Sequence, residues 1–548
     1  MAYTAATMKT MQAKTCIIFP LFLFSFILSN HAQKHPCENT PFPHYCTSAL
    51  RDYNVNPAST IHDTGRSSII HSLRMTNNFV ALVDRYMNAG IAFPESTLRA
   101  LQDCYSLATL TRDFLTDAIQ TVRYRDSLQT WQADYMQTIL SATLTNHQTC
   151  MNGLQEVKSA SNIRNVFTAP ITNGTQSYSV SLALFMHGWG GHKSSERWLR
   201  ELSVMKKVVT NGGGGRKLLQ TIPAGVNVSR VVFVNPKPGQ GNFTTISDAV
   251  AAAPNDTAAS NGYYLINIAA GVYQEYVNIP SNKMYIMMIG AGINKTIITG
   301  NRSVVDGWTT FNSATFVVTG QGFVAQKITF RNTAGAVKHQ AVAVRSGADL
   351  SAFYKCSFEG YQDTLYTHSM RQFYKKCDIY GTIDFIFGNA AVVFQSCNIY
   401  NRLPMPGQFN TVTAQGRTDI NQNTGTSIQN CTVTAAPDLA TSNGTTLTYL
   451  GRPWQNYSRT IVMQSFLDNV INPAGWTPWS GNQSLDTLYY AEFNNTGPGS
   501  VTTNRVNWPG FHLINATDAA NYTVSSFIQG KNWLTATRVP FASGLKLQ

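Results

Sequence analysis

Two segments in the second half of the chain align without gaps, and they limit the folds that such a chain can adopt. They are Cys356-Ser-Phe-Glu-Gly-Tyr-Gln-Asp363 and Cys377-Asp-Ile-Tyr-Gly-Thr-Ile-Asp384, which share the Cys, an apolar third residue, the Gly and the Asp. The segments lie 21 residues apart, and Cys397 follows after another 20. Repeats of this length, made of short strands and turns, are typical of solenoids with stacked coils. We therefore predict an all-β right-handed parallel β-helix from about residue 228 onward.

The two aligned aspartates are the first candidate functional residues. Equivalent positions on adjacent coils lie about one strand spacing apart, roughly 4.8 Å, so Asp363 and Asp384 should lie side by side. Two carboxylates this close cannot both ionise easily, and the pKa of one of them rises. A single Asp in a turn is usually a turn former. A pair in matching positions favours catalysis, with one acid beside one base or nucleophile.

Two glutamines near this pair help to choose between reactions. Gln362 directly precedes Asp363, and Gln340 lies on the preceding coil. Amide N–H donors stabilise the oxyanion that forms in acyl transfer. Glycoside hydrolysis also uses two carboxylates, but its oxocarbenium-like transition state would gain nothing from such donors. The pattern favours acyl transfer, although each glutamine could also be an ordinary polar loop residue.

The N-terminal residues predict a secreted protein. Lys9 and Lys14 precede an apolar run from Ile17 to Leu28, and Asn30-His31-Ala32 is a plausible cleavage site. This is the pattern of a signal peptide over residues 1–32. A membrane anchor is the alternative, but the run is short for a span of about 20 residues. We expect no membrane association after signal cleavage.

The cysteine count and the charge agree with an extracellular location. Removing the signal peptide removes Cys16 and leaves eight cysteines, an even number that permits disulfides. Glycosylation acceptors such as Asn173-Gly-Thr also suit this compartment. The net charge of +13 is scattered along the chain. It indicates either an ordinary solvated surface or affinity for a polyanion. The secretory signal favours an acidic polysaccharide, and no nucleic-acid motif is present.

The region before the repeats has a helical pattern. Apolar residues recur at helical spacing, as in Leu101, Cys104, Leu107 and Leu110. Several such segments predict an all-α helical-bundle pro-domain over residues 33–195. Its four cysteines allow three pairings. We favour Cys37–Cys46, closing an N-terminal hairpin, and Cys104–Cys150, tying two helices together.

A linker separates this domain from the β region. Residues 196–219 contain Asn211 followed by four glycines, which favour an open chain, and then a basic pair. We predict a processing site at Arg216, Lys217, Leu218 and Leu219, which places the catalytic domain at residues 220–548. A plain linker is the alternative.

Eight segments of the β region, taken together and in order, resemble the plant pectinesterases (pectin methylesterases). The segments are Gly241-Asn-Phe-Thr-Thr-Ile246, Gly271-Val-Tyr-Gln-Glu275, Gln340-Ala-Val-Ala-Val-Arg345, Gly360-Tyr-Gln-Asp-Thr-Leu-Tyr366, Gly381-Thr-Ile-Asp-Phe-Ile-Phe-Gly388, Thr413-Ala-Gln-Gly-Arg417, Leu450-Gly-Arg-Pro-Trp454 and Tyr489-Tyr-Ala-Glu-Phe493. The helical region is similar to a pectinesterase-inhibitor domain, chiefly through Ala100-Leu-Gln-Asp-Cys104 and Leu140-Ser-Ala-Thr-Leu-Thr145.

The resemblance implies a function and a set of roles. The enzyme would hydrolyse the methyl esters of homogalacturonan, releasing methanol and free carboxylates. Asp384 would be the nucleophile and Asp363 the general acid and base. Gln362 and Gln340 would hold the oxyanion, and Arg452 would hydrogen-bond Asp384. The implied substrate contacts are Thr310, Gln340, Arg452 and Trp454, and we expect Trp476 to extend the stacking surface of Trp454.

The remaining expectations concern partners, bridges and rivals. The partners would be methyl-esterified pectin, the chain's own pro-domain or separate inhibitor proteins, and a processing protease. No metal or cofactor is expected, because His and Cys show no ligand spacing. Among the solenoid cysteines we favour a Cys377–Cys397 bridge, with Cys356 as a competitor and Cys431 unassigned. The rival functions are a β-helical pectin glycosidase or lyase, and a non-catalytic protein that binds pectin or inhibits esterases.

Overall fold

The structure is a computed structural model that describes residues 36–51, 59–190, 224–442 and 444–546. The described residues, from Pro36 onward, form one compact unit. The predicted signal peptide and the whole predicted linker, including Arg216 to Leu219, lie outside the described residues. Within the part of the chain that is described, no helix is both long and apolar enough to cross a membrane.

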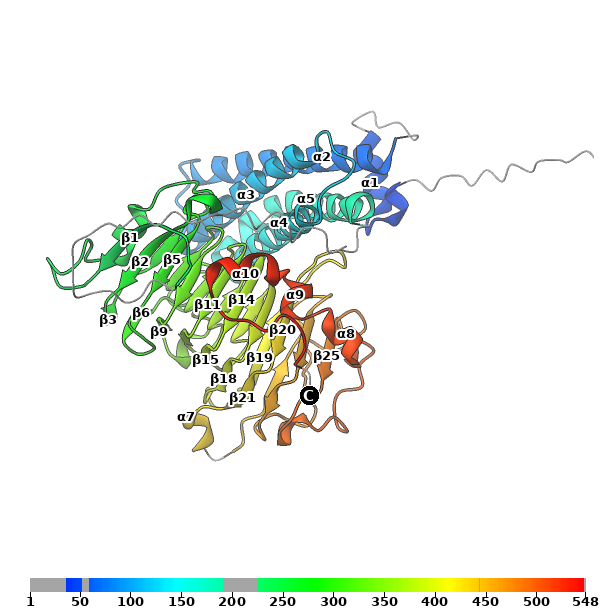
Figure 1. Cartoon of the computed structure of the whole chain (residues 1–548). Coiled ribbons are helices and arrows are strands. Elements are labelled where there is room, and N and C mark those ends of the chain that lie inside the picture. Colours follow the sequence, from blue (N-terminus) through cyan, green and yellow to red (C-terminus); the bar gives the residue numbers. More distant parts are fainter. Residues whose placement is uncertain (1–35, 52–58, 191–223, 443, 547–548) are drawn as a thin grey trace, which may run out of the picture. The chain divides into compact units, whose positions relative to one another are not determined.

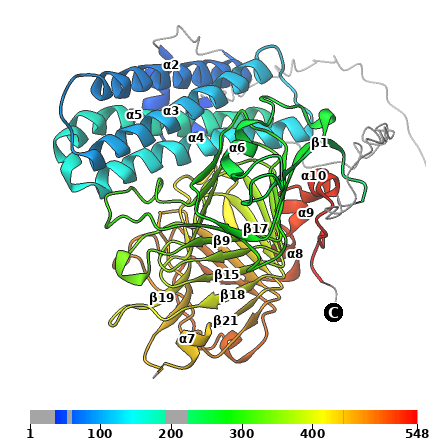
Figure 2. The ribbon, with the colours of Figure 1, turned by 90° about the vertical axis from the view of Figure 1, so that its left-hand side faces the viewer.

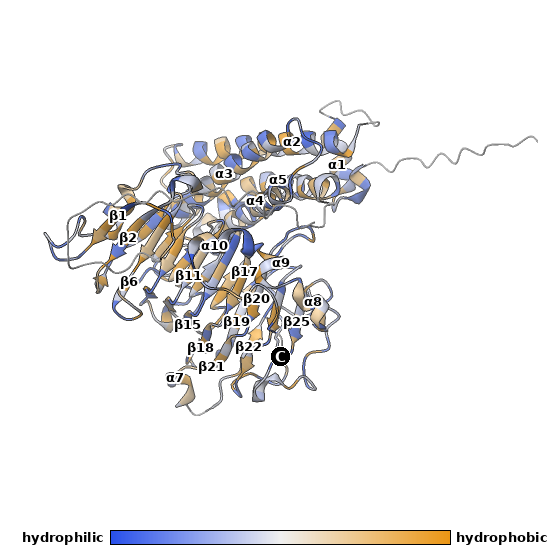
Figure 3. Cartoon of the chain, in the orientation of Figure 1, coloured by the Kyte–Doolittle hydropathy of each residue, from blue (hydrophilic) through white to orange (hydrophobic). Residues whose placement is uncertain are grey.

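The first described part is a bundle of long helices, which lie side by side in Figures 1 and 2. Each of the four long helices packs on two of the others: α2 on α3 and α5, and α4 on α3 and α5. Apolar residues of these helices form a buried cluster between them. Hydrophobic and hydrophilic residues alternate along each helix (Figure 3). The bounds are η1 Pro36–Asn39, α1 Pro43–Arg51, α2 Ile61–Met87, α3 Glu95–Val122, α4 Thr130–Glu156, η2 Lys158–Ala160 and α5 Ser161–Trp189.

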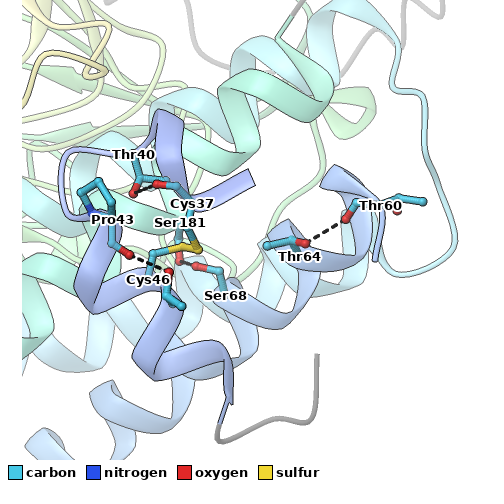
Figure 4. Close-up of a disulfide and its surroundings, with 9 residues drawn as sticks. Cys37, Thr40, Pro43, Cys46, Thr60, Thr64, Ser68 and Ser181 are labelled. Carbon is cyan, nitrogen blue, oxygen red and sulfur yellow. Dashed lines mark hydrogen bonds between the residues drawn. A yellow bond between two sulfur atoms is a disulfide. The ribbon is translucent and has the colours of Figure 1, made fainter. Parts of the chain in front are cut away.

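Hydroxyl groups and two disulfides fix the bundle. Ser68 and Ser72 of α2 hydrogen-bond Ser181 of α5 at 2.7 and 2.9 Å, so buried polar groups of the two helices satisfy each other. Figure 4 shows the Cys37–Cys46 disulfide, which ties η1 to α1 beside this contact. Cys104–Cys150 joins α3 to α4. These are the two pairs that the sequence analysis favours for the bundle.

The second part is a parallel β-helix, as predicted. All strand pairings within its three sheets are parallel, and each coil from β2 to β22 contributes one strand to each sheet. In the coil that contains the first aligned segment, β11 is followed by β12 and then by β13. The next coil repeats this order with β14, β15 and β16, and Ser357 pairs with Asp378, which is 21 residues later. The repeat in the sequence is therefore the coil of the solenoid (Figure 1).

The strands fall into three sheets within the described residues. The eleven-stranded sheet comprises, in spatial order, β1 Val228–Val234, β2 Tyr263–Ile268, β5 Ile286–Ile289, β8 Val324–Gln326, β11 Ser351–Tyr354, β14 Arg371–Lys375, β17 Ala391–Gln395, β20 Gly425–Gln429, β23 Arg459–Met463, β25 Tyr489–Phe493 and β26 Phe511–Leu513. The eight-stranded sheet comprises β24 Phe466–Leu467, β21 Thr432–Ala435, β18 Asn398–Asn401, β15 Asp378–Gly381, β12 Ser357–Glu359, β9 Thr329–Asn332, β6 Thr296–Gly300 and β3 Gly271–Tyr273. The seven-stranded sheet comprises β22 Thr448–Gly451, β19 Asn410–Gln415, β16 Ile386–Gly388, β13 Leu365–Thr367, β10 Val344–Ser346, β7 Phe316–Val318 and β4 Val277–Ile279.

Stacked side chains fill the interior of the coil. Phe353, Tyr374 and Phe394 hold equivalent positions on three successive strands, and their rings stack at 4.8 and 4.7 Å between centroids. Such aromatic contacts add to the burial of apolar area. These stacked rings, which we call the aromatic ladder, explain how a narrow solenoid with short strands obtains a continuous core.

The cysteine column lies in the same core, but the prediction of a Cys377–Cys397 disulfide is wrong. Cys356, Cys377, Cys397 and Cys431 are all buried free thiols. In-register side chains on parallel strands point the same way, and each thiol instead donates to a backbone carbonyl. For example, Cys377 Sγ lies 3.4 Å from Phe353 O. Regular spacing in the sequence thus reflects core packing.

Short helices complete the fold. Side chains of α9 and α10, including Val524 and Leu534, pack with Val324 and Val393 on the eleven-stranded sheet. The β-helix is covered there by its own C-terminal segment (Figure 1). The bounds are α6 Ile246–Ala251, η4 Ala259–Asn261, η5 Ala336–Lys338, α7 Pro437–Ala440, η6 Pro498–Ser500, α8 Ala516–Ala520, α9 Val524–Phe527 and α10 Gly530–Thr537.

Candidate active site

The residues singled out in the sequence gather along the seven-stranded sheet. Asp363 precedes β13 and Asp384 precedes β16, each by two residues, and these strands are paired in register. Both aspartates have a left-handed backbone, with φ of 61° and 51°. Asp363 N also donates to Ile383 O at 3.1 Å. Equivalent positions and equal backbone conformations on adjacent coils therefore bring the two carboxyl groups together, as the repeat predicts.

Asp384 is held by three donors from later coils. Arg452 Nε and Nη2 donate to its two carboxylate oxygens at 2.8 and 2.6 Å. Thr411 Oγ1 donates to Oδ1 at 2.6 Å and accepts from the Asp384 backbone N–H at 2.8 Å. Because β16, β19 and β22 are neighbours, Thr411 on β19 and Arg452 just after β22 reach back along the sheet. This bidentate ion pair fixes the orientation of the carboxylate.

Asp363 has a different environment from Asp384. Its side chain is buried, and among the described residues no donor hydrogen-bonds its carboxyl group. Burial raises the pKa of Asp363 well above its ordinary value, and the charges of Asp384 and Glu156 raise it further, although Arg452 acts in the opposite direction. The site therefore contains one carboxyl group that favours the protonated form beside one that is ion-paired.

Gln340 and Gln362 lie next to this pair. Gln340 precedes β10, and Gln362 precedes Asp363 on the following coil, where its carbonyl accepts from Ala341 N at 3.3 Å. Both are half-buried, and within the described residues their side-chain amides make no hydrogen bond to protein. Two amide donors thus remain free for a ligand at the edge of the carboxylate pair.

Aromatic side chains border the site, and one sequence prediction about them is wrong. The half-buried Trp454 packs edge-on against Phe387 at 6.0 Å. Trp476, expected to extend this stacking surface, is only 1% exposed and donates to Glu492 Oε1 at 3.2 Å. It belongs to the core of the solenoid. The indole near the site is instead Trp479, which is 37% exposed and lies 4.2 Å from the Arg452 guanidinium.

The helical bundle also contacts this edge of the sheet. Glu156, at the end of α4, accepts from Thr310 N at 3.1 Å and from Thr310 Oγ1 at 2.5 Å. Asp103 of α3 accepts from Thr309 Oγ1 at 2.5 Å and from Asn312. Asp103 is buried and Glu156 is half-buried at this contact, and burial raises the pKa of Asp103 to about 7 and raises that of Glu156.

A further contact lies beside Trp454. Thr149 and Asn152 of α4 line a small cavity together with Tyr366 and Trp454. Helix α4 thus lies against the tryptophan at the border of the site.

Over the described part of the chain, no group of three or more His, Cys, Asp or Glu side chains is arranged to hold a metal ion.

Both parts of the chain match known protein families. The family model "Pectinesterase" matches residues 232–531, and the model "Plant invertase/pectin methylesterase inhibitor" matches residues 33–184. A probable pectinesterase/pectinesterase inhibitor 20 of Arabidopsis thaliana is 53% identical over 529 residues, covering 93% of each chain. The chain belongs to the pectinesterase family.

Two further relatives support the assignment. Pectinesterase 2 of Citrus sinensis is 44% identical to this pectinesterase and covers 96% of this chain and 98% of its own. The structure of pectin methylesterase from carrot is 55% identical, with a TM-score of 0.57, and covers 60% of this chain and 100% of its own. As a member of this family, the chain is a carboxylic ester hydrolase that acts on the methyl esters of pectin.

Sequence reasoning missed several residues of this pectinesterase site. Thr411 and Trp479 lie in no repeat and carry no charge, so their sequence context gave no signal. Asp103 lies inside the inhibitor-like segment Ala100–Cys104, but its contact with Thr309 joins positions 206 residues apart. Glu156 likewise meets Thr310 across 154 residues. Glu156 could have been sought among the acidic residues at helix ends of the bundle, whereas Asp103 lies within α3 and its position gives no such signal.

Proposed function

We propose that Asp384 is the nucleophile of this pectinesterase and that Asp363 is its general acid and base. One observation carries the assignment: Arg452 and Thr411 bind Asp384, whereas burial and neighbouring charges raise the pKa of Asp363. A nucleophile needs a free electron pair on an ionised oxygen, and a general acid needs a proton at the working pH. The two environments supply these opposite requirements.

In the first step, a carboxylate oxygen of Asp384 attacks the C6 carbonyl carbon of a methyl-esterified galacturonate. The carbonyl oxygen becomes an oxyanion, which the side-chain amides of Gln340 and Gln362 stabilise by hydrogen bonds. The C–O bond to the methoxy group then breaks, and the Asp363 proton goes to the leaving oxygen. Methanol departs and leaves an acyl-enzyme in which Asp384 is joined to the sugar through an anhydride.

In the second step, a water molecule replaces the methanol. Asp363, now ionised, takes a proton from the water as its oxygen attacks the acyl carbon. The anhydride bond breaks, which returns the electron pair to Asp384 and frees the galacturonic acid, whose remaining proton passes to solvent to give the carboxylate. Arg452 stabilises the carboxylate of Asp384 whenever it is regenerated.

The substrate contacts follow the same edge of the sheet. We propose that Thr310, Gln340, Arg452 and Trp454 bind the polymer, with the Trp454 ring against a sugar face. Thr310 is included because its N–H and hydroxyl donate to Glu156, so a carboxylate already binds there. The polymer would meet the same donors once the bundle is displaced.

We propose further that residues 33–195 form a pro-domain that covers the site of the same chain. Glu156 and Asp103 contact the Thr309–Asn312 segment, and α4 lies against Trp454. The chain would be secreted to the cell wall after loss of residues 1–32. Cleavage within residues 196–219, after Arg216-Lys-Leu-Leu219, would leave residues 220–548 as the active enzyme.

A comparison of three proteins tests this account. The full chain, residues 220–548, and the full chain with Glu156→Ala are assayed for methanol release on highly methylated pectin. We expect residues 220–548 to be active, the full chain to be much less active, and Glu156→Ala to recover part of the difference. Equal activity of all three would remove the inhibitory role. Inactivity of residues 220–548 in a folded state would favour a non-catalytic pectin-binding protein instead.

A further inference from the structure

A row of lysines runs along a corner of the β-helix that takes no part in the catalytic site. From β8 onward, the short connection between the eleven-stranded and the eight-stranded sheet begins with a residue that has a left-handed backbone. On three successive coils this residue is Lys327, Lys355 and Lys376, with φ of 58°, 53° and 52°. Lys327 N donates to Tyr354 O at 3.1 Å, and Lys355 N donates to Lys375 O at 3.0 Å. The three lysines, which we call the lysine ladder, are therefore spaced by one coil, roughly 4.8 Å.

Other cations extend this row onto the next coils. The equivalent corner residues there are Ser396 and Asn430. Lys375 Nζ donates to Ser396 Oγ at 3.2 Å, and Lys546 Nζ donates to Asn430 Oδ1 at 2.7 Å. The C-terminal segment brings Lys546 to this corner, because Gln464 exchanges hydrogen bonds with its backbone. Positively charged side chains therefore lie at this corner on five consecutive coils.

These charges are not neutralised by the protein. Lys327, Lys355, Lys376 and Lys546 are exposed, and within the described residues none of them forms a salt bridge. The nearby carboxylates have other partners, and Glu359 forms its ion pair with Arg331 at 2.6 Å. Asp378 accepts from Asn398 at 2.8 Å. Like charges at this spacing repel one another, so the row is suited to a partner that brings regularly spaced negative charge.

We propose that the lysine ladder binds de-esterified homogalacturonan, the polymer that the enzyme itself produces. This inference rests on the pectinesterase activity. The product is a linear chain with one carboxylate on every sugar. The length of one sugar along the chain is similar to the spacing between successive coils. The fully methylated substrate has no such charges. The catalytic residues lie at a different corner, between the eight-stranded and seven-stranded sheets, so product can be held at the ladder while the catalytic site remains separate.

Binding of the full chain to polygalacturonate and to fully methyl-esterified polymer, measured over a range of ionic strength, tests the proposal. The test variant carries Lys327→Gln, Lys355→Gln and Lys376→Gln. Glutamine suits these positions, because Gln464 holds the equivalent corner on a later coil with φ of 53°. The control variant carries the same change at three exposed lysines in η2, the loop after β1 and α10: Lys158, Lys237 and Lys531. Both variants lose three positive charges.

We expect the ladder variant to bind polygalacturonate about tenfold more weakly at low salt, with a shallower dependence on salt, whereas the control changes less than about twofold. Replacing the three ladder lysines by arginine should preserve binding. Neither set of changes should alter the rate of methanol release from short methylated oligomers, which reports the activity separately. Equal losses of polygalacturonate binding in the ladder and control variants would overturn the proposal. A ladder variant that loses as much binding to the methyl-esterified polymer as to polygalacturonate would also overturn it.

Discussion

Asp363 and Asp384 occupy equivalent positions on adjacent coils, yet Arg452 forms its bidentate ion pair with Asp384 alone. Stacking the coils in register makes the two carboxyl groups neighbours, and the later coil that supplies Arg452 makes them unequal. This inequality is what a two-step ester hydrolysis requires, since one group must attack as an anion and the other must deliver a proton.

The first prediction concerns Arg452. Replacing it by Ala removes the partner of a nearly buried carboxylate, and we expect kcat to fall by about 10²-fold or more. Lys in this position keeps the charge but loses the bidentate geometry, so its activity should lie between those of Ala and wild type. Methanol release from methylated pectin measures both variants. The exposed Arg538, replaced by Ala, serves as the control, and an Arg452→Ala enzyme with wild-type kcat would contradict the role.

The second prediction is that docking of the bundle depends on pH. The pKa of Asp103 is raised to about 7 in the docked state, above its ordinary value of 3.8, because the group is buried. Docked Asp103 therefore binds its proton more tightly than free Asp103. Its contribution to docking is complete below about pH 4 and is lost as the pH rises through about 7. Glu156, whose pKa burial also raises, acts in the same direction.

The measurement is the activity of the full chain divided by that of residues 220–548 at each pH, which removes the pH dependence of the catalytic site itself. We expect this ratio to rise between about pH 5 and pH 8. Asp103→Asn, which cannot ionise, should flatten the rise, and Asp113→Asn on the exposed side of α3 should leave it unchanged. Arg345 and Glu156 face Asp103, so their charges are kept in both variants. A ratio independent of pH in the wild-type chain would contradict the prediction.

The third prediction concerns the aromatic ladder inside the coil. Tyr374 stacks between Phe353 and Phe394 and is fully buried. We expect Tyr374→Ala to lower the free energy of unfolding by about 3–5 kcal/mol. Tyr374→Phe keeps the ring and loses only the hydroxyl that donates to Gln372 Oε1 at 2.9 Å, so it should cost about 1 kcal/mol. Denaturant unfolding of residues 220–548 measures both, and similar losses for the two variants would argue against ring stacking as the main contribution.

The sequence was sufficient to predict the fold and the carboxylate pair in the region where one short pattern repeats. The aligned segments around Asp363 and Asp384 predicted the parallel coil and the pairing of the carboxyl groups, because in-register stacking converts equal spacing into proximity. The same logic failed for the cysteines. The column Cys356, Cys377 and Cys397 is equally regular, but buried thiols and disulfides have the same spacing in such a coil.

Other features depend on contacts that spacing does not encode. A single tryptophan such as Trp476 can serve as core or as a binding surface, and only its position in the fold shows that it is core. Arg452 lies 68 residues from Asp384, and its role came from the family resemblance rather than from the repeat. Glu156 and Thr310 belong to different parts of the chain, so their contact required the structure.

The most direct test of the central claim is methanol release from highly methylated pectin by residues 220–548, with wild type beside Asp384→Asn, and with polymer length followed in the same samples. The account predicts that the wild type releases methanol without shortening the polymer. It also predicts that Asp384→Asn, with unchanged thermal unfolding, is slower by on the order of 10⁴-fold. An Asp384→Asn enzyme within about tenfold of wild type, or a wild type that cuts the backbone, would contradict it.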